Sequence, residues 1–136
     1  MNAVCEDIKN ILEAESSLGL VFNTNLFLYR EPAKPDNTVT IFEGPGMPPL
    51  SHLGSNEDTK HIERPSIQIR IRYKNADEGF ELAYEIQNVL HALIHEVQGS
   101  YNYQLITAIS SPALIDWDDS NRARIALNFN IQRRLT

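Results

Sequence analysis

The chain has a single cysteine, Cys5, among its 136 residues. One cysteine excludes an intramolecular disulfide and a zinc cluster built from the thiolates of one chain, and it favours a reducing compartment. No apolar run approaches the length that spans a membrane. The first nine residues include Glu6 and Asp7 and lack the basic start and apolar run of a signal peptide, so we expect the protein to be made, and to stay, in a cytoplasm.

Positive charge is also scarce. The sequence has 12 Lys and Arg residues against 18 Asp and Glu residues, which gives a net charge of -6. A negative mean field opposes adhesion to nucleic acid and to anionic membranes. We therefore expect neither a membrane nor DNA as a bound partner, although DNA can pass close to an acidic protein surface without binding to it.

The residue patterns of familiar catalytic and cofactor sites are missing. No Gly-rich phosphate loop occurs. The segment around Gly44 and Gly46 does not qualify, because its prolines remove backbone N–H donors that a phosphate-binding loop uses. His91 and His95 are four residues apart on an expected helix and could share a metal, but no glutamate follows His91 and no third ligand is identifiable. We predict that the protein is not an enzyme and holds no cofactor or metal.

A short acidic stretch contains Asp116, Asp118 and Asp119. Carboxylate oxygens of this kind suit calcium or magnesium, but the stretch lacks the glycine and the distal glutamate of an EF-hand loop. Asp and Asn residues also form turns by bonding their own backbone. We interpret the stretch as a turn between two strands.

Apolar periodicity indicates two helices and five strands. The helices are expected at residues 4–12 and 75–97, and Asn75 with Glu78 resembles a capping box at the start of the second. Alternating or apolar runs predict strands at residues 25–31, 38–43, 65–73, 103–109 and 123–131. Prolines and Asx residues at 32–37 favour a hairpin between the first two strands.

The sequence therefore predicts one α+β domain over residues 1–136. Its element order is α-β-β-β-α-β-β, with a mainly antiparallel sheet packed against the two helices. Residues 44–64 show neither a helical nor a strand periodicity and are expected to follow the second strand as a long loop. Loops of such length are often functional, so this one is the first candidate contact element.

The candidate contact residues fall into a loop set and a strand set. From the loop we select Met47, Leu50, His52, Leu53, Glu57, Asp58 and Lys60, and from the acidic turn Asp116, Asp118 and Asp119. The strand set comprises Arg70 and Arg72, opposite the isoleucine face of their strand, with Arg122 and Arg124. Two interpretations of these arginines stay open: solvated strand charge, or pairing with carboxylates of a neighbouring subunit through the planar guanidinium fork.

The second half of the chain has a distinctive order of segments: residues 65–73 (Pro-Ser-Ile-Gln-Ile-Arg-Ile-Arg-Tyr), the helix beginning near Asp77, Ile109 to Pro112, and Asp118 to Arg122 before a final alternating strand. In these segments and their order it resembles the tail terminator and minor capsid proteins of long-tailed phages. Residues 1–43 match only in layout, as a leading helix and a hairpin.

The resemblance implies a non-enzymatic subunit of the virion that assembles in the host cytoplasm. Proteins of this family form a ring, typically a hexamer, that caps the major tail tube protein, ends its polymerisation and offers a surface to the head connector or head completion protein. It implies that DNA only passes through the ring, and that the loop at residues 44–64 faces a neighbour, the tube or the lumen.

Three rival interpretations remain. Another neck or head-completion component shares the small size, the ring assembly and the lack of chemistry. A small α+β enzyme or ligand-binding domain unrelated to phages would need a concave pocket with convergent polar groups. A transient interaction module would stay monomeric until its partner orders the long loop.

Overall fold

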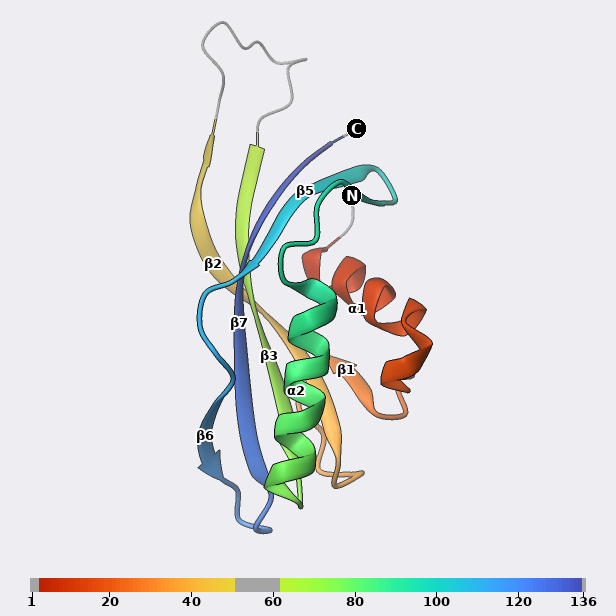
Figure 1. Ribbon diagram of the computed structural model, residues 1–136, viewed down its shortest axis with the longest axis vertical. Helices are drawn as coiled ribbons and strands as arrows, with labels where there is room; N and C mark the ends of the chain where they lie inside the picture. The colour runs from red at the N-terminus through yellow and green to blue at the C-terminus, as the bar shows by residue number, and fades with distance from the viewer. Residues whose placement is uncertain (1–2, 51–61, 136) are drawn as a thin grey trace, which may run out of the picture.

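The computed structural model describes residues 3–50 and 62–135 and has two layers, a twisted sheet and a pair of helices against one of its faces (Figure 1). The helical elements are α1 (Val4–Ala14), the short 3-10 helix η1 (Ser16–Leu18) and α2 (Ala76–Leu90). The strands are β1 (Leu26–Leu28), β2 (Thr38–Leu50), β3 (Ile62–Tyr73), β4 (Glu96–Gln98), β5 (Tyr101–Ala108), β6 (Ala113–Trp117) and β7 (Ala123–Leu135). The fold is α+β with the predicted order α-β-β-β-α-β-β, to which the short strands β4 and β6 are added.

The sheet is mainly antiparallel, and its strand order is β1-β2-β3-β7-β5-β4. The long strand β7 pairs with β3 along one side. On its other side it pairs first with β6 and then with β5. Strand β7 is therefore the centre of the sheet and joins its two ends.

Alternation along β3 and β7 decides which face is covered. The odd-numbered side chains, such as Ile69 and Ile125, are buried in one core with the apolar stripes of α1 and α2. A Cβ on Gly79 of α2 would meet the Ile125 side chain and Tyr73 Cβ, so the helix approaches the sheet closely there. Because successive strand side chains point to opposite faces, the even-numbered residues of β3 and β7 lie on the face without helices.

The hairpin predicted for residues 25–31 and 38–43 is wrong. Strand β1 runs parallel to β2, with Leu26 opposite Val39 and Leu28 opposite Ile41. A two-residue turn can join only antiparallel strands, so a parallel pair needs a longer crossing connection. Residues 29–37 make this connection and pack against the helix-free face.

The loop predicted for residues 44–64 is shorter than expected. Strand β2 continues to Leu50 and β3 begins at Ile62, so two strands extend beyond the helices as an arm (Figure 1). The pairing passes register shifts between Gly44 and Met47 and between Met47 and Leu50. Such irregular pairing explains why no strand period is visible in the sequence there. The intervening positions 51–61 lie outside the described residues.

The second helix is also shorter than predicted. Its start is confirmed, because the Asn75 side chain accepts a hydrogen bond from Glu78 N at 3.2 Å. It ends at Leu90 rather than near Val97, and Ala92 and His95 have positive φ angles of 64° and 56°. Leu93 instead forms an isolated bridge with Ile106, and Val97 lies in β4. No helix in the described part of the chain is long and apolar enough to cross a membrane.

Candidate assembly surfaces

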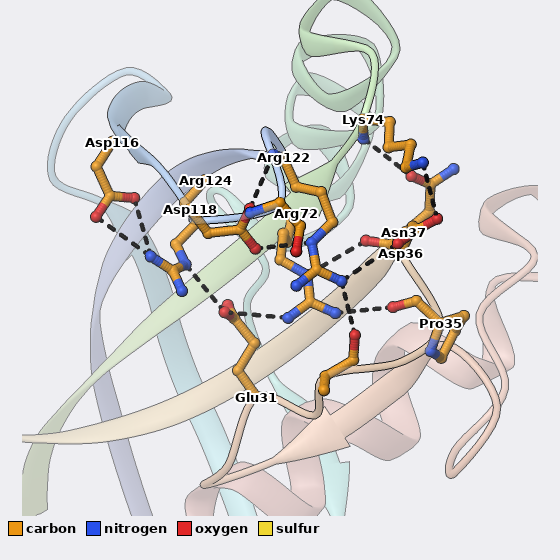
Figure 2. Close-up of polar contacts among 12 residues, drawn as sticks. Glu31, Pro35, Asp36, Asn37, Arg72, Lys74, Asp116, Asp118, Arg122 and Arg124 are labelled. Carbon is orange, nitrogen blue, oxygen red and sulfur yellow. Dashed lines mark hydrogen bonds and ion pairs between the residues drawn. The ribbon is translucent and has the colours of Figure 1, made fainter.

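Arg72 is buried in the centre of a polar cluster on the helix-free face (Figure 2). Its side chain is only 2% exposed and forms an ion pair with Glu31 at 3.3 Å. It also donates from Nη2 to the Pro35 carbonyl at 2.7 Å and from Nε to the Asp36 carbonyl at 3.2 Å. Burial, followed by the nearby Arg122, lowers the pKa of Arg72, while Glu31 acts in the opposite direction. Arg72 is therefore not a solvated strand charge, because its guanidinium group is buried and paired within the chain.

Glu31 joins two strands through their arginines. Besides Arg72 it accepts a hydrogen bond from Arg124 Nε at 3.0 Å. Nη1 of Arg124 lies 3.3 Å from both carboxylate oxygens of Asp116, which is half exposed in β6. An exposed pair of this kind contributes little by itself, but here it continues a network that starts from a buried carboxylate.

Asp118 closes the β6–β7 connection. Its Oδ1 accepts the backbone N–H groups of Ser120 and Arg122, and its Oδ2 accepts Arg122 Nε at 2.7 Å. Although burial alone raises the pKa of Asp118, the hydrogen bonds from Arg122 and Ser120 lower it below its usual value. The turn chemistry predicted for the acidic stretch holds for Asp118, whereas Asp116 lies within a strand.

Arg122 carries the network from this turn to residues 29–37. Its Nη1 donates to the Ala33 carbonyl at 2.7 Å and lies 3.3 Å from Asp36 Oδ1. Together Arg72, Arg122 and Arg124 hold residues 29–37 across one end of the helix-free face, and we name these three side chains with Glu31 the arginine clamp. The residues that meet are up to 93 positions apart, which sequence spacing alone could not reveal.

A second polar cluster ties α1 to the sheet and to the base of the arm. The Tyr103 hydroxyl donates to Asp7 Oδ2 and accepts from Arg133 Nη1 at 3.1 Å. Arg133 also bonds Glu63 at 2.7 Å and stacks on the Tyr101 ring at 3.8 Å from its centroid. Burial, then the bond to Asp7, raises the pKa of Tyr103. No motif or spacing in the sequence signals this cluster.

The rest of the helix-free face is open, and we call it the free sheet face. Its cations are Arg64, Arg70 and Arg134, at even positions of β3 and β7. Met47, Arg64 and Leu105 line a shallow hollow of about 180 Å³ on it together with Thr107, Asn130, Ile131 and Gln132. A second hollow lies between Phe42, Gln68 and Ile109.

Strand β6 is a short edge of the sheet with every side chain exposed. Leu114, Ile115 and Trp117 are between 44% and 52% exposed. A register shift between Leu114 and Asp116 interrupts its pairing with β7. Short length, a shift and a charged residue all discourage unwanted strand pairing at an edge.

The histidines are not arranged as the sequence suggested. Helix α2 ends before both of them, so His91 and His95 do not lie four apart on one helix face. His91 Nδ1 instead accepts the Ala108 N–H at 3.0 Å. Within residues 3–50 and 62–135, no group of three His, Cys, Asp or Glu side chains is placed to hold a metal ion.

The predicted contact residues therefore divide into four groups. Met47 and Leu50 are exposed on the arm at 53% and 43%, and Asp119 is exposed beside the β6–β7 turn. Arg70 is half-buried, stacked 4.9 Å from the Phe42 ring centroid. Arg72, Arg122, Arg124, Asp116 and Asp118 meet in or beside the arginine clamp, and His52, Leu53, Glu57, Asp58 and Lys60 lie outside the described residues. Contact with a neighbour or a tube stays a prediction for all of them.

The fold and its surfaces define a small structural subunit of the α+β class. The sequence model of the bacteriophage tail terminator protein family matches residues 9–134, so the chain belongs to this family. It is a structural protein of a phage tail. No match was found among curated proteins.

The fold also recurs in a solved structure described as "Virion of native gene transfer agent (GTA) particle". The two chains superpose with a TM-score of 0.68 over 97% of this chain and 95% of that chain, at 13% sequence identity. At this identity the similarity concerns the fold alone, and it extends over nearly the whole chain.

Proposed function

We propose that the protein caps the tail tube as a ring, stops polymerisation of the tube and forms the surface on which the head joins the tail. The observation that carries this proposal is the family match over residues 9–134. The partners are further copies of the chain, in a ring of six, together with the major tail tube protein and the head connector or completion protein. The protein works in the virion, after assembly in the host cytoplasm, and catalyses no reaction.

The arm formed by β2 and β3 supports a role in contacting the tube. It extends beyond the helices and exposes Met47 and Leu50. Its base is fixed, because Arg64 Nε donates to the Pro48 carbonyl at 2.7 Å and Arg133 bonds Glu63. An arm held at its base can present apolar side chains to a partner at little cost in conformational entropy.

The net charge of -6 supports a ring through which DNA passes without being gripped. A passage lined by acidic surfaces would let the polyanion slide.

Tube length tests the function directly. We would add the purified protein to growing tails of its parent phage and measure tube lengths by electron microscopy. Capping gives tubes of one length with the intact protein. A variant with Met47→Ser and Leu50→Ser should lose capping if the arm makes the contact, and deletion of residues 56–61 tests the remainder of the segment between β2 and β3.

The alternatives give different results in the same assay. Tubes that keep growing with the intact protein would contradict termination and favour a component on the head side of the neck. Unimpaired capping by both variants would retain termination but exclude the arm as the tube contact. The matched control is Val21→Ser, since Val21 is 53% exposed outside the arm and should cap like the intact chain.

A further inference from the structure

Helix α2 presents an acidic stripe that nothing in the described chain neutralises. Asp77, Glu81, Tyr84, Glu85 and Asn88 are exposed and recur at the spacing of one helical face. With Glu78, the helix has four carboxylates, and none of them has an ion pair or a hydrogen-bond partner for its side chain among residues 3–50 and 62–135. The Tyr84 side chain is 52% exposed in the middle of this stripe.

The complementary charge lies on the opposite face of the same chain. Arg64, Arg70 and Arg134 have no carboxylate partner among the described residues. Within residues 3–50 and 62–135, Arg64 bonds the Pro48 carbonyl, and Arg70 bonds Gln68 at 3.2 Å and leaves its Nε buried without a partner. By contrast, Arg72, Arg122, Arg124 and Arg133 are all paired with acidic side chains.

We propose that the acidic stripe of α2 on one copy docks onto the free sheet face of the next copy. This inference rests on the proposed ring, and it names the two surfaces that make the contact between neighbours. The carboxylates of α2 meet Arg64, Arg70 and Arg134, and neither set has a charged partner in the part of the chain that the structure describes. The guanidinium group suits this role because it binds carboxylates through a planar fork of donors.

Shape supports the same contact. The hollow between Met47, Arg64 and Leu105 has a volume of about 180 Å³. This is comparable in volume to the ~150 Å³ cavity known to accommodate benzene, so one aromatic ring fits. Tyr84 is the exposed aromatic side chain of the stripe, and it enters this hollow with its flanking carboxylates beside Arg64. Buried tyrosines and arginines are the residue types that dominate interface energies.

The two surfaces lie on opposite layers of the molecule. One copy therefore cannot bind both surfaces to a single partner in a two-fold symmetric dimer. Each copy uses its helix layer toward one neighbour and its sheet layer toward the other. Contacts of this head-to-tail kind continue from copy to copy and close into a ring when the rotation allows. The occupant of the free sheet face is therefore a second copy of this chain.

Two charge-reversed variants test the contact. The first carries Glu81→Lys and Glu85→Lys, and the second carries Arg70→Glu and Arg134→Glu. Each variant alone presents like charges across the interface, and we expect the subunit concentration at half-assembly to rise at least about 100-fold. In an equal mixture every contact is again between opposite charges, so the mixture should assemble as an alternating ring with an even number of subunits.

Assembly is measured by sedimentation of the free protein and by counting copies bound at tube tips. Recovery in the mixture also shows that both variants are folded. A matched control carries Glu6→Lys on α1 and Glu15→Lys directly after it. It changes the net charge as the first variant does but lies outside α2, and it should assemble like the intact chain. Assembly of the intact chain should weaken near 1 M salt, where the screening length falls to about 3 Å.

Three outcomes overturn the inference: unimpaired assembly of either variant alone, failure of the mixture to recover, or an intact chain that stays a single copy both free and at tube tips. If the intact chain caps tubes while the variants cap equally well, only this contact is refuted. If the mixture recovers assembly but the intact chain never stops tube growth, the contact stands and the proposed function fails.

Discussion

Two buried tyrosines on β5 provide a sharp test of the second polar cluster. Tyr101 and Tyr103 are both fully buried, and both rings lie near the Arg133 guanidinium, at 3.8 and 5.8 Å from their centroids. Only the Tyr103 hydroxyl has partners, since it connects Asp7 with Arg133. The Tyr101 hydroxyl is buried with no partner among the described residues. The same substitution, Tyr to Phe, should therefore have opposite consequences at two neighbouring positions.

For Tyr103→Phe we expect a loss of about 2–3 kcal/mol in the free energy of unfolding, because two hydrogen bonds to charged groups disappear and their partners stay buried. With 136 residues and about 2.1 cal/mol/K of unfolding entropy per residue, this lowers Tm by roughly 7–10 °C. For Tyr101→Phe we expect a change within about 0.5 kcal/mol, or a small gain, since a buried hydroxyl without a partner is removed and the ring stays on Arg133.

Urea denaturation at low protein concentration measures both variants without a contribution from assembly. An equal slope m for the variants and the intact chain shows that only stability has changed. Equal losses at the two positions, or a loss above about 1 kcal/mol for Tyr101→Phe, would refute the assignment of the hydrogen bonds to Tyr103.

Further predictions concern the arm, the β6–β7 turn and the lone thiol. Gly46 has φ +66° and its Cβ would overlap the Arg64 carbonyl, so Gly46→Ala should cost at least about 2 kcal/mol, whereas Gly19→Ala, with the same φ but free space, should cost about 1. Hydrogen bonds lower the pKa of Asp118 in the folded chain, so its contribution to the free energy of unfolding is present above about pH 4 and is lost as the pH falls through the lower folded pKa. The difference in stability between the intact chain and Asp118→Asn, measured from urea midpoints, should therefore close toward about pH 2.5. Burial, then Glu43, raises the pKa of Cys5 to about 12, so at pH 8 a thiol reagent should react at least about 1000-fold more slowly with the native than with the unfolded chain.

The parts of the fold that the sequence predicted correctly are those in which apolar residues follow a single helical or strand periodicity. Strands β3 and β7 alternate because one face is buried under helices, and most of their even-numbered residues are polar. Helix α1 has a clean apolar stripe, and Asn75 caps α2 as predicted. These signals are local, so a single sequence contains them.

The errors occur where distant contacts outweigh a local signal. The Gly- and Pro-rich continuation of β2 lacks a strand period but is held by pairing with β3, through register shifts that a sequence does not show. The apolar period of α2 continues to Leu93 and Val97, yet Leu93 pairs with Ile106 and the helix stops. In both cases the partner strand lies far away in the sequence and decides the local structure.

The reversed direction of β1 has the same origin and bears most on the candidate surfaces. Prolines and Asx residues at 32–37 indicate a change of direction, which both a hairpin and a crossing connection require. The choice between them depends on Arg72 in β3 and Arg122 in the β6–β7 turn, which bind carbonyls of that connection and follow it in the chain. These two arginines are paired within the subunit, where they hold residues 29–37 to the sheet. Among the described residues, the cations of the sheet without a carboxylate partner are those of the free sheet face. This division cannot be seen in the sequence, and it separates the arginines that stabilise the subunit from those that we assign to assembly.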